Sequence, residues 1–220
     1  MISSHLGGDG RQGREYLDSM SVAPWSVVDE GYLRAYQWAG ALAAGTPLPQ
    51  EAPTMPLGPG EVAHITLPAT AVSGYFGEDK PYNRSFLLLG GPVGLAVTGA
   101  ASIARNSAKK AEAERAAVPR WHMLGSADLV ATSQRMVASA SSGQSESFWY
   151  AQTSPVELTQ GAGGMPGVQF QGAGHPVLRF DAAWAPMLYV FVHYIVDGQA
   201  PAVPMPQGLL ERAQQQGRIT

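Results

Sequence analysis

Residues 177–198 read VLRFDAAWAPMLYVFVHYIVDG, a short strand pattern followed directly by an apolar helix. Pro186 suits the first helical turn because its fixed φ is helical and its missing N–H is not needed there. Gly198 suits the end of the helix, where a left-handed residue is common. The helix expected over 186–196 is apolar on nearly every side, so it must be covered by protein layers, a barrel mouth or a membrane. The large side chains whose helical spacing places them against the sheet are Trp184, Leu188, Phe191 and Ile195.

Short strand patterns fill the chain before this helix. They are rich in β-branched and aromatic residues and are separated by turn residues. The expected strands are 61–67, 129–131, 136–138, 147–150, 156–158, 168–170 and 177–180. We expect Pro68 to end the first strand, Ser133-Gln134 to form a turn, and the glycine-rich run 161–167 to form a hairpin turn. Strands this short and evenly spaced predict a sandwich or a partly open barrel.

The N-terminal part predicts one helix and a linker. Residues 1–45 are expected to form a tail and an amphipathic helix, with Ser26 as its N-cap and Gly45 as its end. Its apolar stripe consists of Val28, Tyr32, Ala35, Trp38, Ala39 and Leu42. Packing on the main domain is favoured over partner binding, since most such stripes face a core. Residues 46–60 contain five prolines and are expected to be a linker. The main domain would then span 61–198, followed by a C-terminal tail, 199–220, with a short helix near Leu209.

An unusual segment, 86–118, interrupts the strand patterns. Residues 86–104 form a run of 19 residues without a charge, close to the length that crosses a bilayer. Four glycines and Pro92 weaken a spanning helix, so we rank a helix packed on protein first, a membrane-embedded or interfacial helix second and a full span third. Residues 105–118 are helix-forming and locally basic, as in segments that attach to anionic membranes. The residues expected to contact a membrane or partner are Phe86, Leu87, Leu88, Leu89, Arg105, Lys109, Lys110 and Arg115.

One pattern in the second half of the chain resembles a known domain family. It consists of the hairpin Gly125-x-x-x-Leu129-x-x-Thr132-x-x-Arg135-Met136, then Phe148-Trp149-Tyr150, two further strands and a helix that begins with Trp184-Ala185-Pro186. This pattern resembles the bacterial pleckstrin-homology-like (PH-like, GRAM-related) domains, of the actinobacterial type and of unknown function. The resemblance covers 61–67 and 121–198. It implies an α+β fold: a bent antiparallel sheet or partly open barrel closed by a C-terminal helix. The N-terminal helix and the inserted apolar and basic segment are departures from the simple domain.

The sequence lacks the motifs of most catalytic classes. It contains no cysteine, no zinc-type histidine spacing, no Walker loop and no Gly-x-Ser-x-Gly elbow. We therefore expect no catalytic residues, no metal and no cofactor, so the protein is predicted not to be an enzyme. His193 is expected to be a hydrogen-bonded core residue, and Phe148-Trp149-Tyr150 is expected to pack in the core rather than stack on a ligand.

Two functional hypotheses follow. The first is a PH-like binding module at the inner membrane face that contacts anionic lipid or a protein partner through 86–115. The second is a soluble scaffold that forms homo-oligomers, in which the small residues spaced from Gly90 to Ala104 mediate self-association. A net charge of −3 argues against nucleic acid as a partner. Residues 1–13 lack the pattern of a secretory signal, so the expected location is the cytoplasm, including the inner face of the membrane.

Overall fold

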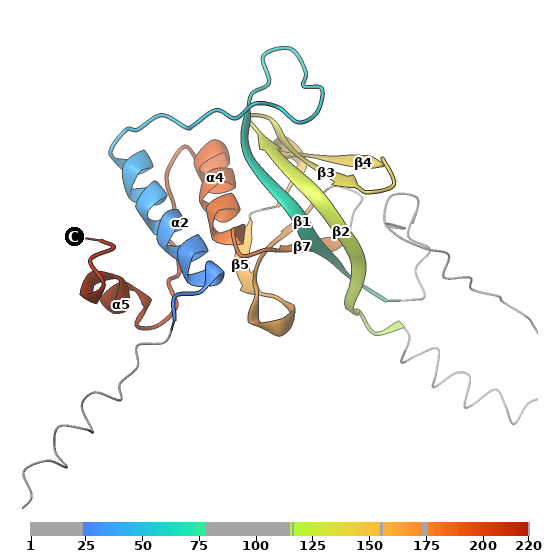
Figure 1. The fold of residues 1–220 in the computed structure, drawn as a ribbon. Coiled ribbons are helices and arrows are strands. Elements are labelled where there is room, and N and C mark those ends of the chain that lie inside the picture. Colours follow the sequence, from blue (N-terminus) through green and yellow to red (C-terminus); the bar gives the residue numbers. More distant parts are fainter. Residues whose placement is uncertain (1–23, 78–114, 116, 155, 173–175, 220) are drawn as a thin grey trace, which may run out of the picture.

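The computed structural model describes residues 24–77, 115, 117–154, 156–172 and 176–219. It is an α+β fold with an open sheet of seven antiparallel strands (Figure 1). The strands are β1 (Ala63–Phe76), β2 (Arg120–Thr132), β3 (Arg135–Ala140), β4 (Ser145–Trp149), β5 (Glu157–Gln160), β6 (Pro166–Gln171) and β7 (Val177–Asp181). The helices are α2 (Val27–Ala43), α4 (Ala185–Asp197) and α5 (Leu209–Gln215), and short 3-10 turns lie at Tyr150–Gln152 (η1) and Ala162–Gly164 (η2). The strand order is β4-β3-β2-β1-β7-β6-β5, which leaves β4 and β5 at the edges.

The core lies between the inner face of the sheet and α4. Phe148, Phe170 and Phe180 contact one another there, with ring centroids 5.1 to 6.0 Å apart. Leu188 and Phe191 of α4 are fully buried in the same cluster, and Trp184 and Ile195 pack against it half-buried. The expected packing of this helix on the sheet is confirmed. Gly198 ends α4 with a φ of 70°, as its position in the sequence predicts.

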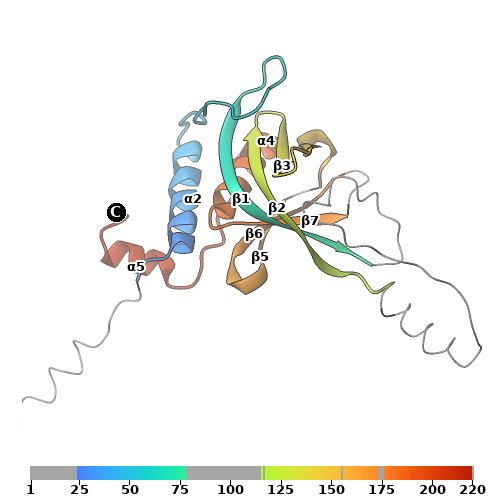
Figure 2. The same cartoon turned by 45° about the vertical axis from the view of Figure 1, so that its right-hand side comes forward.

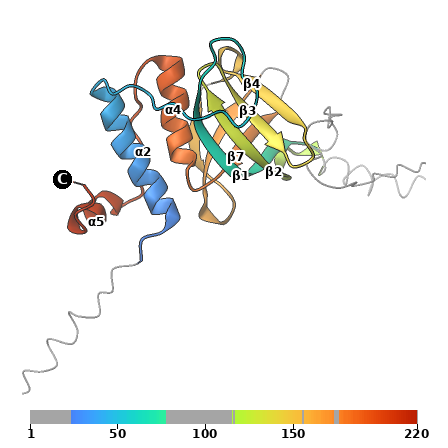
Figure 3. The same ribbon diagram turned by 45° about the horizontal axis from the view of Figure 1, so that its top comes forward.

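The helices form a layer on one side of the sheet (Figure 3), with α2 packed on α4 and α5 packed on α2. Ser26 caps α2 as predicted, because its hydroxyl accepts the Asp29 backbone N–H at 3.0 Å. Gly31 faces the β7–α4 connection so closely that a Cβ there would overlap the Ala183 carbonyl. The short helix expected near Leu209 is present as α5, and Leu209 is buried.

Strand β1 is longer than predicted, and the expectation that Pro68 ends it is wrong. The strand bulges between Leu67 and Thr70 and continues to Phe76. Ala69 in the bulge has a φ of 49°, and its N–H donates to Asp128 Oδ1 at 2.8 Å. The bulge removes Pro68 from the hydrogen-bond ladder, so its missing N–H is not needed there. Strand β2 is likewise longer than the expected 129–131 and begins at Arg120.

A buried ion pair joins the start of β1 to the β2–β3 hairpin. Arg135 donates to both Glu61 carboxylate oxygens, through Nε at 2.8 Å and Nη2 at 3.0 Å. The Thr132 hydroxyl and the Gly58 N–H each donate a further hydrogen bond of 2.7 Å to this carboxylate. Both oxygens of the Glu61 carboxylate therefore accept two hydrogen bonds, which offsets the cost of burying its charge. The same contacts hold the linker that ends at Gly60 to the sheet.

Candidate functional site

The predicted contact segment joins the sheet at the end of a two-stranded ribbon. Strands β1 and β2 pair from Ala63↔Thr132 to Phe76↔Arg120, and the intervening residues connect those last two partners. Figure 2 shows this end of the ribbon pointing away from α2 and α5. The ribbon end from which the inserted segment leaves the sheet and to which it returns therefore lies on the side of the molecule remote from these two helices.

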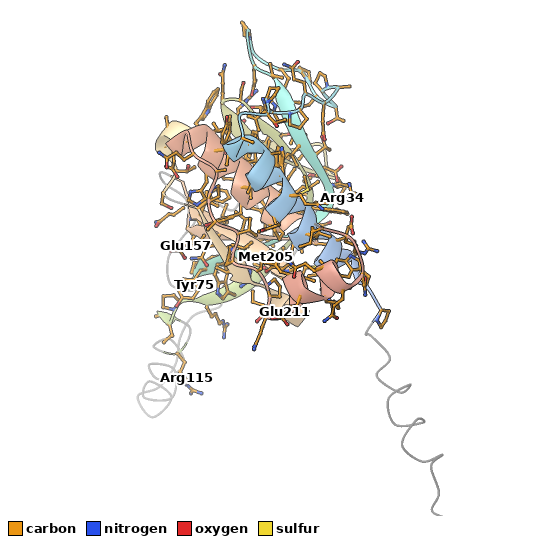
Figure 4. All side chains as sticks on the ribbon, turned by 90° about the vertical axis from the view of Figure 1, so that its left-hand side faces the viewer. Arg34, Tyr75, Arg115, Glu157, Met205 and Glu211 are labelled. Carbon is orange, nitrogen blue, oxygen red and sulfur yellow. The ribbon has the colours of Figure 1, made fainter. Side chains whose placement is uncertain are left out.

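The structure places one of the predicted contact residues. Arg115 is exposed and lies beyond Tyr75 on the side remote from Arg34 of α2 (Figure 4). The other predicted contact residues, Phe86, Leu87, Leu88, Leu89, Arg105, Lys109 and Lys110, lie outside the described residues, as does most of the segment 86–118.

The outer side of the ribbon end carries exposed apolar side chains that the sequence reasoning missed. Tyr75 and Trp121 face each other across β1 and β2, with ring centroids 5.4 Å apart. Met123 lies on the same face two residues further along β2, and it is 63% exposed. Tyr75 is 42% exposed. The spacing of Trp121 and Met123 predicts that both side chains lie on one face of a strand. Whether that face is exposed depends on the tertiary fold and could not be predicted from the sequence.

The opposite side of the ribbon end is internally packed. Phe76 and His122 stack with their ring centroids 4.4 Å apart, and His122 Nε2 lies 3.1 Å from the Phe76 carbonyl oxygen. Gly74 leaves space for this arrangement, because a Cβ there would lie about 3 Å from the Phe76 ring and the Leu124 side chain. These contacts brace the two strands, so the outer aromatic residues are presented on an ordered support.

Positive charge accompanies the exposed aromatic side chains. Arg115 and Arg120 are exposed where the chain approaches β2. The Arg179 guanidinium lies 4.4 Å from the Trp121 ring centroid on the same outer face of the sheet, but it is buried and paired with Asp181, so it adds no free positive charge to this surface. Tyrosine and tryptophan next to basic residues are typical of surfaces that meet lipid headgroups, because each ring has an apolar body and a polar tip.

The histidines of the described part of the chain make contacts with backbone carbonyls. His64 Nδ1 lies 2.6 Å from Pro49 O, and His193 Nε2 lies 2.9 Å from Val156 O. His193 Nδ1 also contacts Asp197 Oδ2 at 2.7 Å, an acidic partner that the sequence analysis did not identify. Within the described ranges, no three histidine, cysteine or acidic side chains gather as metal ligands would.

Comparisons with known proteins give no relative. No protein-family description, no curated protein and no solved structure matches the chain. Among the helices described, none is long and apolar enough to span a membrane.

Proposed function

We propose that this chain is a non-enzymatic, PH-like binding module that attaches to an anionic membrane surface through the β1–β2 ribbon end and the segment 86–115. The observation that carries the proposal is the exposure of Tyr75 and Met123 beside Trp121 at the place where the apolar and basic segment joins the sheet. Tyr75, Trp121 and Met123, with the exposed Arg115 and Arg120 nearby, support a binding surface at this end of the sheet.

The PH-like part of the proposal is supported by topology. Strand β1 pairs with β2 along its length and with β7 from Ala71 to Tyr75, so it belongs to both halves of the bent sheet. The helix α4 covers β5 and β6 after the last strand. A bent antiparallel sheet followed by a covering C-terminal helix is what the resemblance implies. Fold alone assigns no ligand, which is why the proposal rests on the ribbon end.

The expected binding energy suits reversible attachment. A fully buried aliphatic side chain contributes about 1.5–3 kcal/mol, and 86–97 contains several. Each basic residue near an anionic surface adds about 1 kcal/mol. Lys109, Lys110 and Arg115 supply such charges, although Glu112 and Glu114 offset part of them.

The direct test is co-sedimentation of the folded full chain with vesicles. Phosphatidylcholine vesicles with and without phosphatidylserine are compared at low and at high salt. We expect binding that requires phosphatidylserine and weakens with salt, because surface charges are screened beyond about 10 Å at 0.1 M salt. Absence of binding to both vesicle types would reject membrane attachment.

The second candidate is a soluble self-associating scaffold. It is favoured by the small-residue spacing Gly90-x-x-x-Gly94 and Ala96-x-x-x-Ala100, which permits close helix packing. Its signature is a concentration-dependent mass in light scattering without any vesicle binding. A monomeric mass at all concentrations, together with salt-sensitive vesicle binding, would exclude it.

A further inference from the structure

A cavity of about 480 Å³ lies on the outer face of the sheet, where β1 and β7 meet the β5–β6 turn and the start of α4. This volume falls within the range of about 300–1,000 Å³ that small-molecule sites occupy. Its walls are largely apolar and include Pro68, Ala71, Met123, Met165 and Trp184. An apolar ligand would gain free energy there, because filling such a cavity removes apolar surface from water.

The charge at the wall of the cavity is already neutralised. Among the described residues, Asp181 is the only charged one that lines the cavity. It is buried, as is Arg179, whose Nε donates to Asp181 Oδ1 at 2.8 Å. The Gly161 backbone covers the carboxylate so closely that a Cβ there would overlap it. The cavity therefore offers a ligand no free charge, and a charged group would lose its hydration there without compensation.

Backbone donors at the wall are also used or missing. On the side of β7, Ala182 N–H donates to Pro166 O at 3.1 Å. On the side of the β1 bulge, Ala69 N–H donates to Asp128 Oδ1 at 2.8 Å, and Pro68 has no N–H. These positions do not need a hydrogen bond from a ligand, so they favour a hydrocarbon over a polar group.

One wall of the cavity is held in place by the helices. Trp184 is half-buried and packs against the core between the sheet and α4. The Arg34 guanidinium lies 5.3 Å from the Trp184 ring centroid, and Arg34 is itself paired with Glu30 at 2.9 Å. This wall is therefore formed before a ligand arrives, which lowers the ordering cost of binding.

The cavity is continuous with the exposed surface of the ribbon end. Met123 belongs to both, since it lines the cavity and lies two residues from Trp121 on the same face of β2. Ala71 at the cavity and Tyr75 at the ribbon end likewise share one face of β1, about 13 Å apart at ~3.3 Å per residue. A molecule that reaches the ribbon end from a membrane would therefore meet the cavity along the same face.

We propose that this cavity binds one hydrocarbon chain of a lipid, supplied by the membrane that the ribbon end contacts. The inference rests on the proposed function for the source of the chain, and it adds that the sheet recognises a lipid chain rather than a headgroup. Apolar walls without a free charge select a hydrocarbon. Met123 and Met165 suit such a ligand, because methionine side chains are unbranched and adapt their shape to what they contact.

The test is a titration of the full chain, with its methionine methyl groups labelled for NMR. The probe is decylphosphocholine below the concentration at which it forms micelles, and glycerophosphocholine, which has the headgroup without the chain, is its counterpart. We expect decylphosphocholine alone to shift the Met123 and Met165 signals, with Met205, which does not line the cavity, as the control. Equal shifts by both probes, shifts of Met123 without Met165, or no shifts would overturn the proposal.

Two variants locate the chain. Met165→Gln makes one wall polar at a distance from the ribbon, so it should weaken decylphosphocholine binding by about fivefold or more. Ala71→Leu fills the cavity and should abolish binding in a chain that is shown to be folded by circular dichroism. Met205→Gln is the control and should bind like the wild type. If Ala71→Leu does not fold, Met165→Gln alone decides, and wild-type binding by folded Met165→Gln would overturn the proposal.

Failure of this inference and failure of membrane attachment give different results. Sedimentation with phosphatidylserine-containing vesicles reports attachment, whereas the methionine signals report the cavity. Vesicle binding without the expected shifts would reject the cavity and leave attachment in place. Shifts in a chain that binds no vesicles would reject the membrane as the source of the lipid chain, and with it the inference.

Discussion

Glu61 shows at the residue scale how burial and hydrogen bonding compete. Burial alone would raise the pKa of this carboxyl, but the hydrogen bonds from Arg135, supported by Gly58 and Thr132, lower the pKa to about 2. Its folded-state pKa therefore lies below the ordinary value of 4.5. Such a group stabilises the fold above its unfolded pKa, and the stabilisation is lost as the pH falls from 4.5 toward 2.

The first prediction concerns Glu61→Gln. Removing one partner of a buried ion pair costs about 3–5 kcal/mol, so we expect a lower free energy of unfolding in urea at neutral pH. We also expect the loss of stability between pH 4.5 and pH 3 to be smaller than in the wild type, because the titrating group is gone. Glu51→Gln, an exposed position, is the control and should behave like the wild type. An unchanged pH dependence in Glu61→Gln would show that this pair does not govern acid stability.

Local alternation predicted some side-chain environments and missed others. Phe148 and Tyr150 are buried together, while Trp149 is 41% exposed with Arg135 over its ring, which is one of the two arrangements that alternation allows. The partner of His193 was present in the sequence as Asp197, four residues later, which is the spacing of neighbours on a helix. The burial of Asp181 had no sequence signal, because the β5–β6 turn that covers it is distant in the chain.

At the scale of elements, α4 holds the two layers together. Its Leu188 is fully buried in the core, whereas Val196 on the same helix is 53% exposed. The second prediction is that Leu188→Ala lowers the free energy of unfolding by about 2–5 kcal/mol. Val196→Ala should change it by less than about 0.5 kcal/mol. Equal effects of the two substitutions would contradict the packing of α4 on the sheet.

The contact of α2 with the β7–α4 connection gives a third prediction. Alanine is about 1 kcal/mol more favourable than glycine within a helix, so Gly40→Ala on α2, where nothing lies within 4 Å of the new methyl group, should stabilise the protein. Gly31→Ala should destabilise it despite the same propensity gain, because the new methyl group would overlap the Ala183 carbonyl. Thermal unfolding of both variants decides the sign. Stabilisation by both would mean that α2 does not approach the connection this closely.

The order of elements could be predicted from the sequence, but their lengths could not. Short apolar runs indicated the strands β3 to β7, and Pro186 and Gly198 bounded the last large helix. Pro68 predicted a strand end because proline lacks an N–H for a ladder. The bulge made that rule inapplicable, since Thr70 Oγ1 donates to Leu67 O at 3.1 Å and closes a local turn around Pro68 and Ala69. Such a bulge depends on the partner strand, which a single strand pattern does not contain.

At the scale of the whole molecule, two surfaces are separated by the sheet. The helices α2 and α5 lie at one end, and the β1–β2 ribbon carries Tyr75, Trp121 and the chain toward Arg115 at the other (Figures 1 and 2). The net charge of −3 would not draw the molecule as a whole to an anionic surface. Attachment would therefore depend on the local basic and aromatic groups, and it would orient the protein with its ribbon end toward the lipid.

A matched pair of tyrosines tests this claim most directly. Tyr75 on the ribbon and Tyr36 on α2 are both 42% exposed, so Tyr75→Ser and Tyr36→Ser remove similar exposed area from opposite ends of the molecule. The measurement is the fraction of each folded variant that sediments with phosphatidylserine-containing vesicles at low salt. We predict weaker binding for Tyr75→Ser and wild-type binding for Tyr36→Ser. Equal binding by the two variants, or a loss confined to Tyr36→Ser, would contradict membrane contact through the ribbon end.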